Sequence, residues 1–207
     1  SVWILMNGDA QIHQLFPTVV RTSSIENFQA LNEKLMPGVE TIRKMTPNTK
    51  PDDWACTVYT TLHSPIELLD TEPFTILKPI IQREISQYAD ALGIHAPIEH
   101  LRFLDAWLNI YAKGDSQEMH IHQNSIFSGI YYIKAPEGCS EVQFQSPLMD
   151  TMIAPPLFET NELNSTGAFL PAREGRMILF RSHLKHAVMT NNVDEERISL
   201  SFNVDLA

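Results

Sequence analysis

The sequence has few cysteines, few basic residues and no long apolar run. Its two cysteines, Cys56 and Cys139, form no CxxC pair, which argues against a disulfide framework or a zinc ribbon. This cysteine usage predicts that the protein is located in the reducing cytoplasm. Lys and Arg total 15 against 25 Asp and Glu, a formal net charge of −10, so the basic face that duplex nucleic acid requires is missing. The apolar run in Ser1–Met6 is too short for a signal-peptide core or a membrane span. No membrane partner is expected.

The chain also has no internal repeat and no low-complexity tract. Of its 207 residues, 43% are hydrophobic and 19% are charged, which excludes a disordered or collagen-like chain and predicts a sizeable core. This length suits one domain, because domains usually have about 100–200 residues. We expect a single domain over residues 1–207, with 1–98 mostly helical support and 99–207 a strand-rich core.

Two amphipathic helices are predicted in the first half. In residues 23–45, apolar side chains recur every three or four positions, the spacing of one helix face. This helix is expected to start at a serine cap and to be interrupted at Pro37-Gly38. A second helix follows Pro73 and ends at Gly93, a residue type that commonly ends helices. Both helices are expected to support a sheet.

From His100 onward the apolar pattern has a period of two, which is typical of strands. Strands are predicted at residues 100–111, 119–122, 128–135, 141–145, 176–181 and 197–205. Gly, Pro or Asn turn signals separate them. Short strands at this spacing predict a mainly β fold with flanking helices, most simply a jelly roll, the cupin-like double-stranded β-helix.

One long connection interrupts these strands. Residues 146–175 contain four prolines and show little periodicity. So long a connection in a compact domain is usually functional. We expect a loop lid over the prime substrate, which is a small molecule or a peptide side chain.

The histidines give the sharpest chemical signal. His120 and His122 are two positions apart, so on a strand both imidazoles point to one face and can meet one metal ion. A third ligand from another strand completes a facial site, and His186 is our candidate. His183 is expected to face elsewhere, toward substrate or in a structural role. A lone HxH is more often only a polar strand end, so the metal interpretation depends on its context.

The final strand supplies that context, because its polar residues share one face. They are Arg197, Ser199, Ser201 and Asn203. Arg197 and Ser199 suit an anion, since the guanidinium fork matches a carboxylate and the hydroxyl adds a hydrogen bond. Asn109 and Tyr111 share a face of an earlier strand and are expected to line the same cavity. The alternatives are a solvated outer face for the final strand and ordinary core polarity for Asn109 and Tyr111.

Together these motifs resemble the iron(II)/2-oxoglutarate-dependent oxygenases of bacteria and phages. The resemblance extends from about Trp107 to the C-terminus and is carried by His120-x-His122, residues 128–132, 179–186 and 197–203. It implies a double-stranded β-helix that binds Fe(II) through an HxD or HxE pair and a distant His. A basic residue further along the chain then binds the far carboxylate of 2-oxoglutarate.

Carried onto this chain, the resemblance assigns the metal to His120, His122 and His186. It assigns the cosubstrate 2-oxoglutarate to Arg197 and Ser199, with Asn109 and Tyr111 similar to the Asn and Tyr that contact it in AlkB-like members. The implied cofactors are Fe(II) and 2-oxoglutarate, with O2 as the second cosubstrate. The implied activity is oxidative decarboxylation of 2-oxoglutarate coupled to hydroxylation of a C–H bond.

One position departs from the family pattern, because His122 stands where a carboxylate is usual. The triad is then three histidines, as in cysteine dioxygenase-like proteins, or two histidines with a water-filled position. Asp115 or Glu118 is a further source of a carboxylate if the chain folds back. An all-imidazole triad leaves the metal more positive than the usual one.

Other classes of function stay open at this point. A zinc hydrolase can also use an HxH pair, but the HxHxDH continuation of one such class is missing, since Gln123 and Asn124 follow. A cupin-like metal-binding protein without turnover is the other alternative. A serine hydrolase is disfavoured because no GxSxG elbow exists. The oligomeric state is open, with a homodimer as one option.

Overall fold

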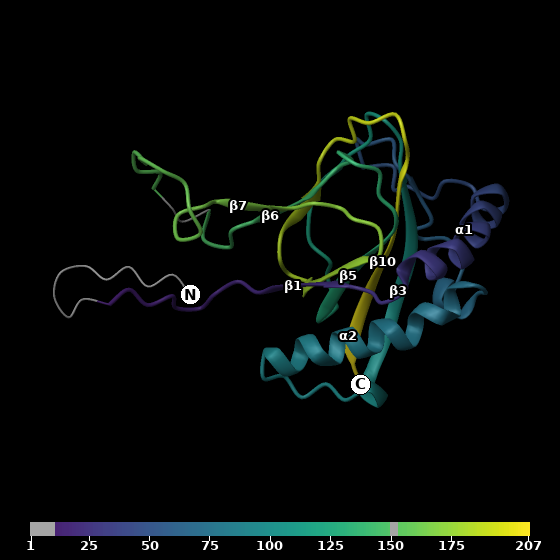
Figure 1. Cartoon of the computed structure of the whole chain (residues 1–207), viewed down its shortest axis with the longest axis horizontal. Coiled ribbons are helices and arrows are strands. Elements are labelled where there is room, and N and C mark those ends of the chain that lie inside the picture. The colour runs from purple at the N-terminus through teal and green to yellow at the C-terminus, as the bar shows by residue number, and fades with distance from the viewer. Residues whose placement is uncertain (1–10, 150–152) are drawn as a thin grey trace.

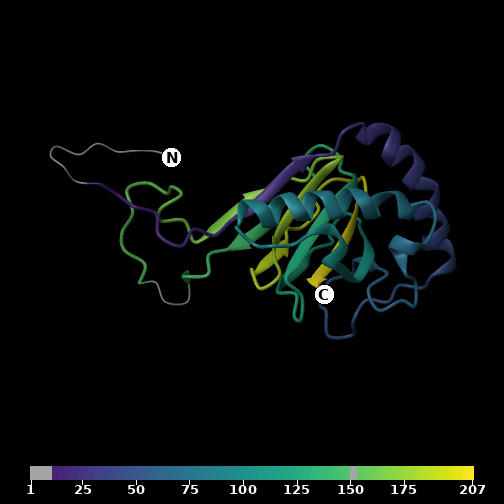
Figure 2. The ribbon, with the colours of Figure 1, turned by 90° about the horizontal axis from the view of Figure 1, so that it is seen from below.

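The computed structural model describes residues 11–149 and 153–207, so the run Ser1–Met6 lies outside the described residues. The chain forms two antiparallel β-sheets with two long helices on the outer face of the larger sheet (Figures 1 and 2). This confirms the predicted mainly β jelly roll with flanking helices. Within the described residues, no helix combines the length and the apolar character that crossing a membrane requires.

The larger sheet has six strands. They are β1 (Val20–Ser24), β2 (Tyr59–Thr60), β3 (Leu101–Tyr111), β5 (Phe127–Lys134), β8 (Arg176–Arg181) and β10 (Arg197–Leu206), in the order β1-β8-β5-β10-β3-β2. The edge strands β1 and β2 were not predicted. The predicted serine cap at the start of the first helix is wrong, because Ser23 and Ser24 pair with β8 as part of β1.

The smaller sheet has four short strands. They are β4 (Gln117–His120), β6 (Val142–Gln145), β7 (Gly167–Leu170) and β9 (His186–Val188), in the order β4-β9-β6-β7. Here β7 lies inside the predicted connection 146–175, and β9 was also missed. The predicted strand 119–122 is displaced, since His122 follows the end of β4. Strands of three or four residues are too short for a period of two to be recognised.

Two long helices and three short 3-10 helices complete the described part of the fold. They are α1 (Phe28–Met45), α2 (Leu77–Ala91), η1 (Leu68–Asp70), η2 (Phe74–Ile76) and η3 (Ile98–His100). The predicted interruption at Pro37 is wrong, because α1 continues through it. Proline removes one backbone hydrogen bond there, and burial of Leu35 and Val39 on either side of it favours the continuous helix. The predicted end of the second helix is confirmed by Gly93, which has a φ of 69°.

Two separate groups of buried side chains pack on the two faces of the larger sheet. The first, the helix-side core, lies between this sheet and the helices and includes Leu35, Val39, Ile81, Ile85, Leu200 and Phe202. The second, the inter-sheet core, lies between the two sheets and includes Tyr111, Tyr132, Val142, Phe144 and Phe180. Strand β10 contributes its apolar residues to the helix-side core, whereas its alternate residues, which are polar, face the smaller sheet.

Candidate functional site

Three histidines meet between the sheets. His120 ends β4, His122 follows it, and His186 begins β9, where it pairs with His120. Their potential ligand atoms all lie within 4.8 Å of one another. The Nε2 atoms of His120 and His122 are 3.3 Å apart. Two nitrogens bound at right angles to one ion at 2.0–2.1 Å lie about 3 Å apart, so the pair fits a shared metal ion.

Each imidazole is oriented by a hydrogen bond from its other ring nitrogen. His120 Nδ1 donates to the carbonyl oxygen of Glu118 at 2.7 Å, and His186 Nδ1 donates to that of Leu184 at 2.9 Å. His122 Nδ1 donates to Asn203 Oδ1 at 2.6 Å. These bonds place the proton on Nδ1 and leave the Nε2 lone pairs directed at each other, the tautomer in which metal-binding histidines are usually held.

The electrostatics of the cluster keep the rings uncharged. Burial, together with the neighbouring His120, lowers the pKa of His122 to about 4. Burial also lowers the pKa of His120, and it lowers that of His186 well below its ordinary value. The three imidazoles are therefore neutral at pH 7, the form that binds metal ions.

The carboxylates considered for this site are occupied elsewhere. Asp115 accepts hydrogen bonds from Thr57 Oγ1 and from the Ala112 N–H, and Glu118 Oε1 accepts from the Cys56 N–H at 2.9 Å. Among the described residues, the metal-compatible cluster contains histidines only. The idea that Asp115 or Glu118 folds back to supply a carboxylate is not supported by this arrangement.

Arg197 is the most unusual buried side chain of the inter-sheet region. It has no exposed surface, and its guanidinium carbon lies 4.6 Å from the ring centroid of Tyr111 and 4.8 Å from that of Tyr132. None of its three side-chain nitrogens has a hydrogen-bond partner among the described residues. A guanidinium is always charged in proteins, and a buried charge is normally paired.

The two tyrosines do not supply the missing anion. Burial raises the pKa of Tyr111 to about 12 and also raises that of Tyr132, so both phenols stay neutral at pH 7. They contact the cation through their ring faces, which is a cation–π interaction. The Tyr132 hydroxyl is itself buried without a partner. Neither phenol therefore neutralises the charge of Arg197.

The other predicted residues lie on the same face as Arg197. In the β3–β10 register, Tyr111 pairs with Arg197 and Asn109 with Ser199. Asn109 donates to Ser201 Oγ at 3.2 Å, while its buried Oδ1 has no partner among the described residues. His183 is exposed and lies outside the histidine cluster, in agreement with its exclusion from the ligand set.

Aromatic side chains of the inter-sheet core contact Arg197 at one end and the histidine cluster at the other. Tyr111, Tyr132, Phe144 and Phe180 belong to the same inter-sheet core. The ring of Phe180 lies 4.6 Å from that of His186, and Trp107 lies 5.5 Å from His122, measured between centroids. Sequence reasoning gave no role to Phe180, whose only signal was its place in the segment 179–186 that also carries His186.

Comparison with known proteins gives one family match. Residues 105–203 match the model of the family described as "Putative 2OG-Fe(II) oxygenase", where 2OG stands for 2-oxoglutarate. The matched segment contains His120, His122, His186 and Arg197. No curated protein matches the chain.

Many solved structures share the fold. The non-heme alpha-ketoglutarate-dependent epimerase SnoN from nogalamycin biosynthesis has 11% identity and a TM-score of 0.65, covering 92% of this chain and 77% of its own. A prolyl-4-hydroxylase of Pseudomonas putida has 10% identity and a TM-score of 0.63, with coverage of 92% and 94%. HygX of Streptomyces hygroscopicus, solved with nickel and 2-oxoglutarate, has 12% identity and a TM-score of 0.62, with coverage of 92% and 83%.

The family match and the fold agree. Residues 105–203, just under half of the chain, match the 2OG-Fe(II) oxygenase family, as the resemblance in the motifs predicted, and solved oxygenases share the fold of this chain. Its histidine cluster suits the metal that the family name includes.

Proposed function

We propose that this protein is a non-haem Fe(II)- and 2-oxoglutarate-dependent dioxygenase that hydroxylates a C–H bond of a small molecule or a peptide side chain. The observation that supports this best is the buried, unpaired Arg197 on the strand that also carries Asn203, the partner of a cluster histidine. When bound, iron and 2-oxoglutarate supply the oxidative chemistry, in which R–H, O2 and 2-oxoglutarate give R–OH, succinate and carbon dioxide.

In this proposal His120, His122 and His186 bind the metal through their Nε2 atoms. Their Nδ1 partners fix the ring orientations before the metal arrives, which limits the entropy lost on binding. Asn203 has the main orienting role for His122, and Ser128 supports it, because its hydroxyl donates to Asn203 Oδ1 at 2.8 Å. The aromatic rings of Trp107 and Phe180 exclude water from one side of the cluster.

Charge balance supports a dianionic cosubstrate. Three neutral imidazoles leave the full double positive charge on a divalent ion, and Arg197 adds one more positive charge. Among the described residues, no carboxylate forms an ion pair with Arg197. The two carboxylates of 2-oxoglutarate offset two of these three charges, one at each end of the site.

Arg197 then binds the distal carboxylate of 2-oxoglutarate through its guanidinium fork. Tyr111 and Tyr132 hold the guanidinium plane between their rings, so little side-chain entropy remains to be lost. Ser199 and Asn109 line the same face of the sheet and offer further hydrogen bonds to the bound acid.

Spectroscopy and turnover test the proposal together. Without air, Fe(II) with 2-oxoglutarate should give a weak charge-transfer band in the visible range, and admission of O2 should release succinate. His120→Ala, His122→Ala and His186→Ala should each weaken Fe(II) binding in calorimetry, whereas His183→Ala, a matched exposed histidine, should not. A zinc hydrolase or a cupin-like protein without turnover would show neither the band nor succinate. Unchanged Fe(II) affinity in His122→Ala would contradict the three-histidine site.

A further inference from the structure

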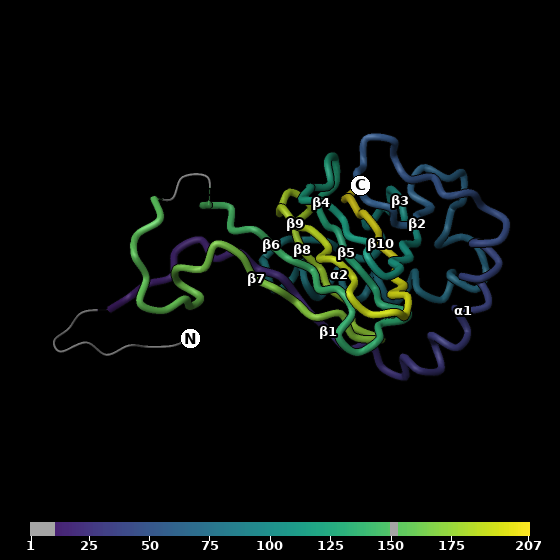
Figure 3. The backbone as a smooth tube through the Cα atoms, turned by 90° about the horizontal axis from the view of Figure 1, so that it is seen from above, coloured from purple at the N-terminus to yellow at the C-terminus, as the bar shows by residue number. Residues whose placement is uncertain are grey.

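Two segments project from the same side of the body. One is residues 11–19, which leads into β1, and the other is residues 153–166, which precedes β7 (Figures 1 and 3). We call them the paired arms, because both project to the same side of the body in Figures 1 to 3 and Gln14 Nε2 donates to Glu162 Oε1 at 3.5 Å.

Large apolar side chains of the paired arms are exposed to solvent. Phe16 is 95% exposed, Ile153 91% and Phe158 98%. Further exposed apolar residues in the arms are Ile12, Leu15, Val19, Leu157 and Leu163. Soluble proteins rarely gather so much apolar surface on a projection unless it meets a partner.

The arms leave the body beside the histidine cluster. Val20, directly after the first arm, pairs with Phe180, whose ring contacts those of His122 and His186. The second arm belongs to the connection that starts after β6, where Phe144 pairs with His186. The bases of both arms therefore lie near the proposed metal site, and the arms extend outward from there.

The charge of the arms limits the kind of partner. Glu159 and Glu162 are exposed, and neither arm contains Lys or Arg. A complementary partner is apolar and basic. An anionic lipid surface attracts basic segments rather than acidic ones, and a second copy of this chain carries the same net charge of −10, which opposes association.

We propose that the paired arms dock a polypeptide substrate through apolar and basic side chains that flank its target residue. Small molecules are usually enclosed in concave pockets, whereas these arms are extended and project outward, which suits a longer partner. This inference rests on the proposed function and narrows its substrate to a side chain of a polypeptide.

Fluorescence anisotropy with two synthetic peptides tests the docking surface. One labelled peptide is built of Leu and Lys, and the other has Glu in place of every Lys. The protein is the anaerobic complex with Fe(II) and 2-oxoglutarate. The basic peptide should bind saturably, and at least tenfold more tightly than the acidic one.

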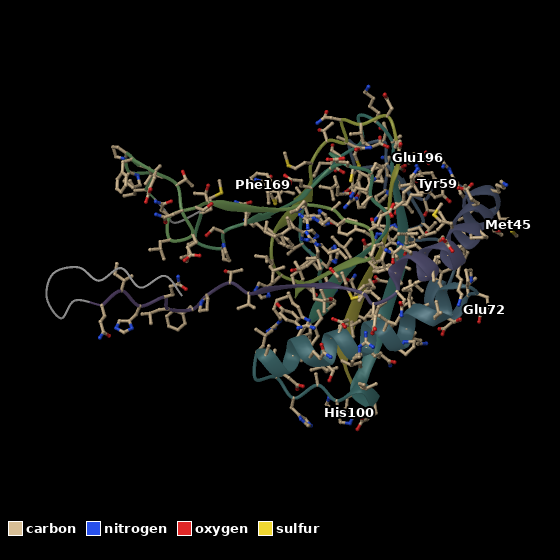
Figure 4. All side chains as sticks on the ribbon, viewed as in Figure 1. Met45, Tyr59, Glu72, His100, Phe169 and Glu196 are labelled. Carbon is tan, nitrogen blue, oxygen red and sulfur yellow. The ribbon has the colours of Figure 1, made fainter. Side chains whose placement is uncertain are left out.

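Variants locate the binding surface. Phe16→Ser combined with Phe158→Ser should weaken the basic peptide at least tenfold. Met45→Ser is the matched control, because Met45 is 79% exposed and lies on α1, on the opposite side of the body from the arms (Figure 4); it should leave binding unchanged. A second arm variant, Glu159→Lys with Glu162→Lys, changes only exposed charge and should weaken the basic peptide while strengthening the acidic one.

Several results would overturn the proposal. These are absence of saturable binding of the basic peptide, equal binding of both peptides, or equal effects of the arm and control variants. Binding of phosphatidylserine vesicles in place of the peptide, or self-association in sedimentation that the arm variant abolishes, would assign the arms to a membrane or to a second copy. The 2-oxoglutarate affinity of the same samples separates the two proposals: a chain that binds the peptide but not 2-oxoglutarate keeps the docking surface and loses the oxygenase assignment.

Discussion

The two faces of the larger sheet bury very different side chains, and two adjacent tyrosines on β5 show the contrast. Tyr131 points into the helix-side core, where its hydroxyl donates to Asn32 Oδ1 at 2.7 Å. Tyr132 points into the inter-sheet core, where its buried hydroxyl has no partner among the described residues. At this pair of positions the helix side satisfies its hydroxyl from within the chain, whereas the inter-sheet side leaves a buried donor that our proposal assigns to the region of the ligand.

Strand β10 separates the two roles by alternation. Its apolar residues Leu200 and Phe202 complete the helix-side core, while Arg197 and Ser199 face the smaller sheet. Unpaired buried polar groups lower the stability of a folded protein. The polar residues on the inter-sheet face therefore reduce the free energy of unfolding of this protein. Substitutions on the helix side should therefore lower stability without changing binding, whereas those on the other face should change binding and, where they remove an unpaired buried charge, raise stability.

The largest stability effect is expected from Phe202→Ala. The Phe202 ring is fully buried and packs over Gly129, where an added Cβ would lie 2.3 Å from the ring. Removing the ring leaves a cavity, so we expect a loss of about 3–5 kcal/mol in the free energy of unfolding. Urea unfolding measures it, with Phe169→Ala as control, since Phe169 is half-exposed on β7 (Figure 4). A change in the 2-oxoglutarate affinity of the folded Phe202→Ala variant would contradict the assignment of stability to one face of the sheet and of binding to the other.

Arg197→Met should stabilise the protein in the absence of metal and 2-oxoglutarate. The substitution keeps a long side chain and removes a charge that has no partner among the described residues. Replacing buried ionic groups by apolar ones commonly adds about 1–4 kcal/mol, and the lost cation–π contacts place the expected gain near the lower end. Urea unfolding of the apo protein checks the sign. A destabilised variant would show that Arg197 serves the fold.

Asn203→Ala should weaken metal binding tenfold to a hundredfold, which corresponds to about 1.4–2.7 kcal/mol. Removing the hydrogen-bond partner of a metal-binding histidine typically lowers metal affinity by this factor. This variant removes the shorter of the two hydrogen bonds at His122 Nδ1, leaving Ser128 Oγ at 3.0 Å, and does not touch the Nε2 atoms that we propose as ligands. Calorimetry with Fe(II) measures the change. Ser201→Ala is the control on the same face, since the Ser201 hydroxyl pairs with Asn109, and equal effects of both variants would speak against a specific role of Asn203.

The smallest effect on binding is expected from Ser199→Ala. A hydrogen bond to a charged group contributes about 1.5–3 kcal/mol, and we expect the low end, about a tenfold loss of 2-oxoglutarate affinity. The affinity for Fe(II) should stay the same. An unaltered 2-oxoglutarate affinity would remove Ser199 from the proposed cosubstrate site.

Much of this site could be predicted because it depends on local spacing. Two-residue alternation identified the shared face of β10 and that of β3, and the HxH spacing identified two members of the histidine cluster. The bond between His122 and Asn203 joins residues far apart in sequence, so spacing could not predict it. The short strands β1, β7 and β9 have only three to five residues, and their pairing depends on neighbours that the sequence does not identify.

The most direct test is the 2-oxoglutarate affinity of the anaerobic Fe(II) complex in the parent and in Arg197→Ala. Removing one partner of a buried charge pair costs about 3–5 kcal/mol, and each 1.4 kcal/mol is about tenfold, so we expect a loss of roughly two to three powers of ten. Arg197→Lys should lose less, because the charge remains while the planar fork is gone. Fe(II) affinity should barely change. Equal 2-oxoglutarate affinities in the parent and Arg197→Ala would contradict the assignment of this protein as a 2-oxoglutarate-dependent dioxygenase.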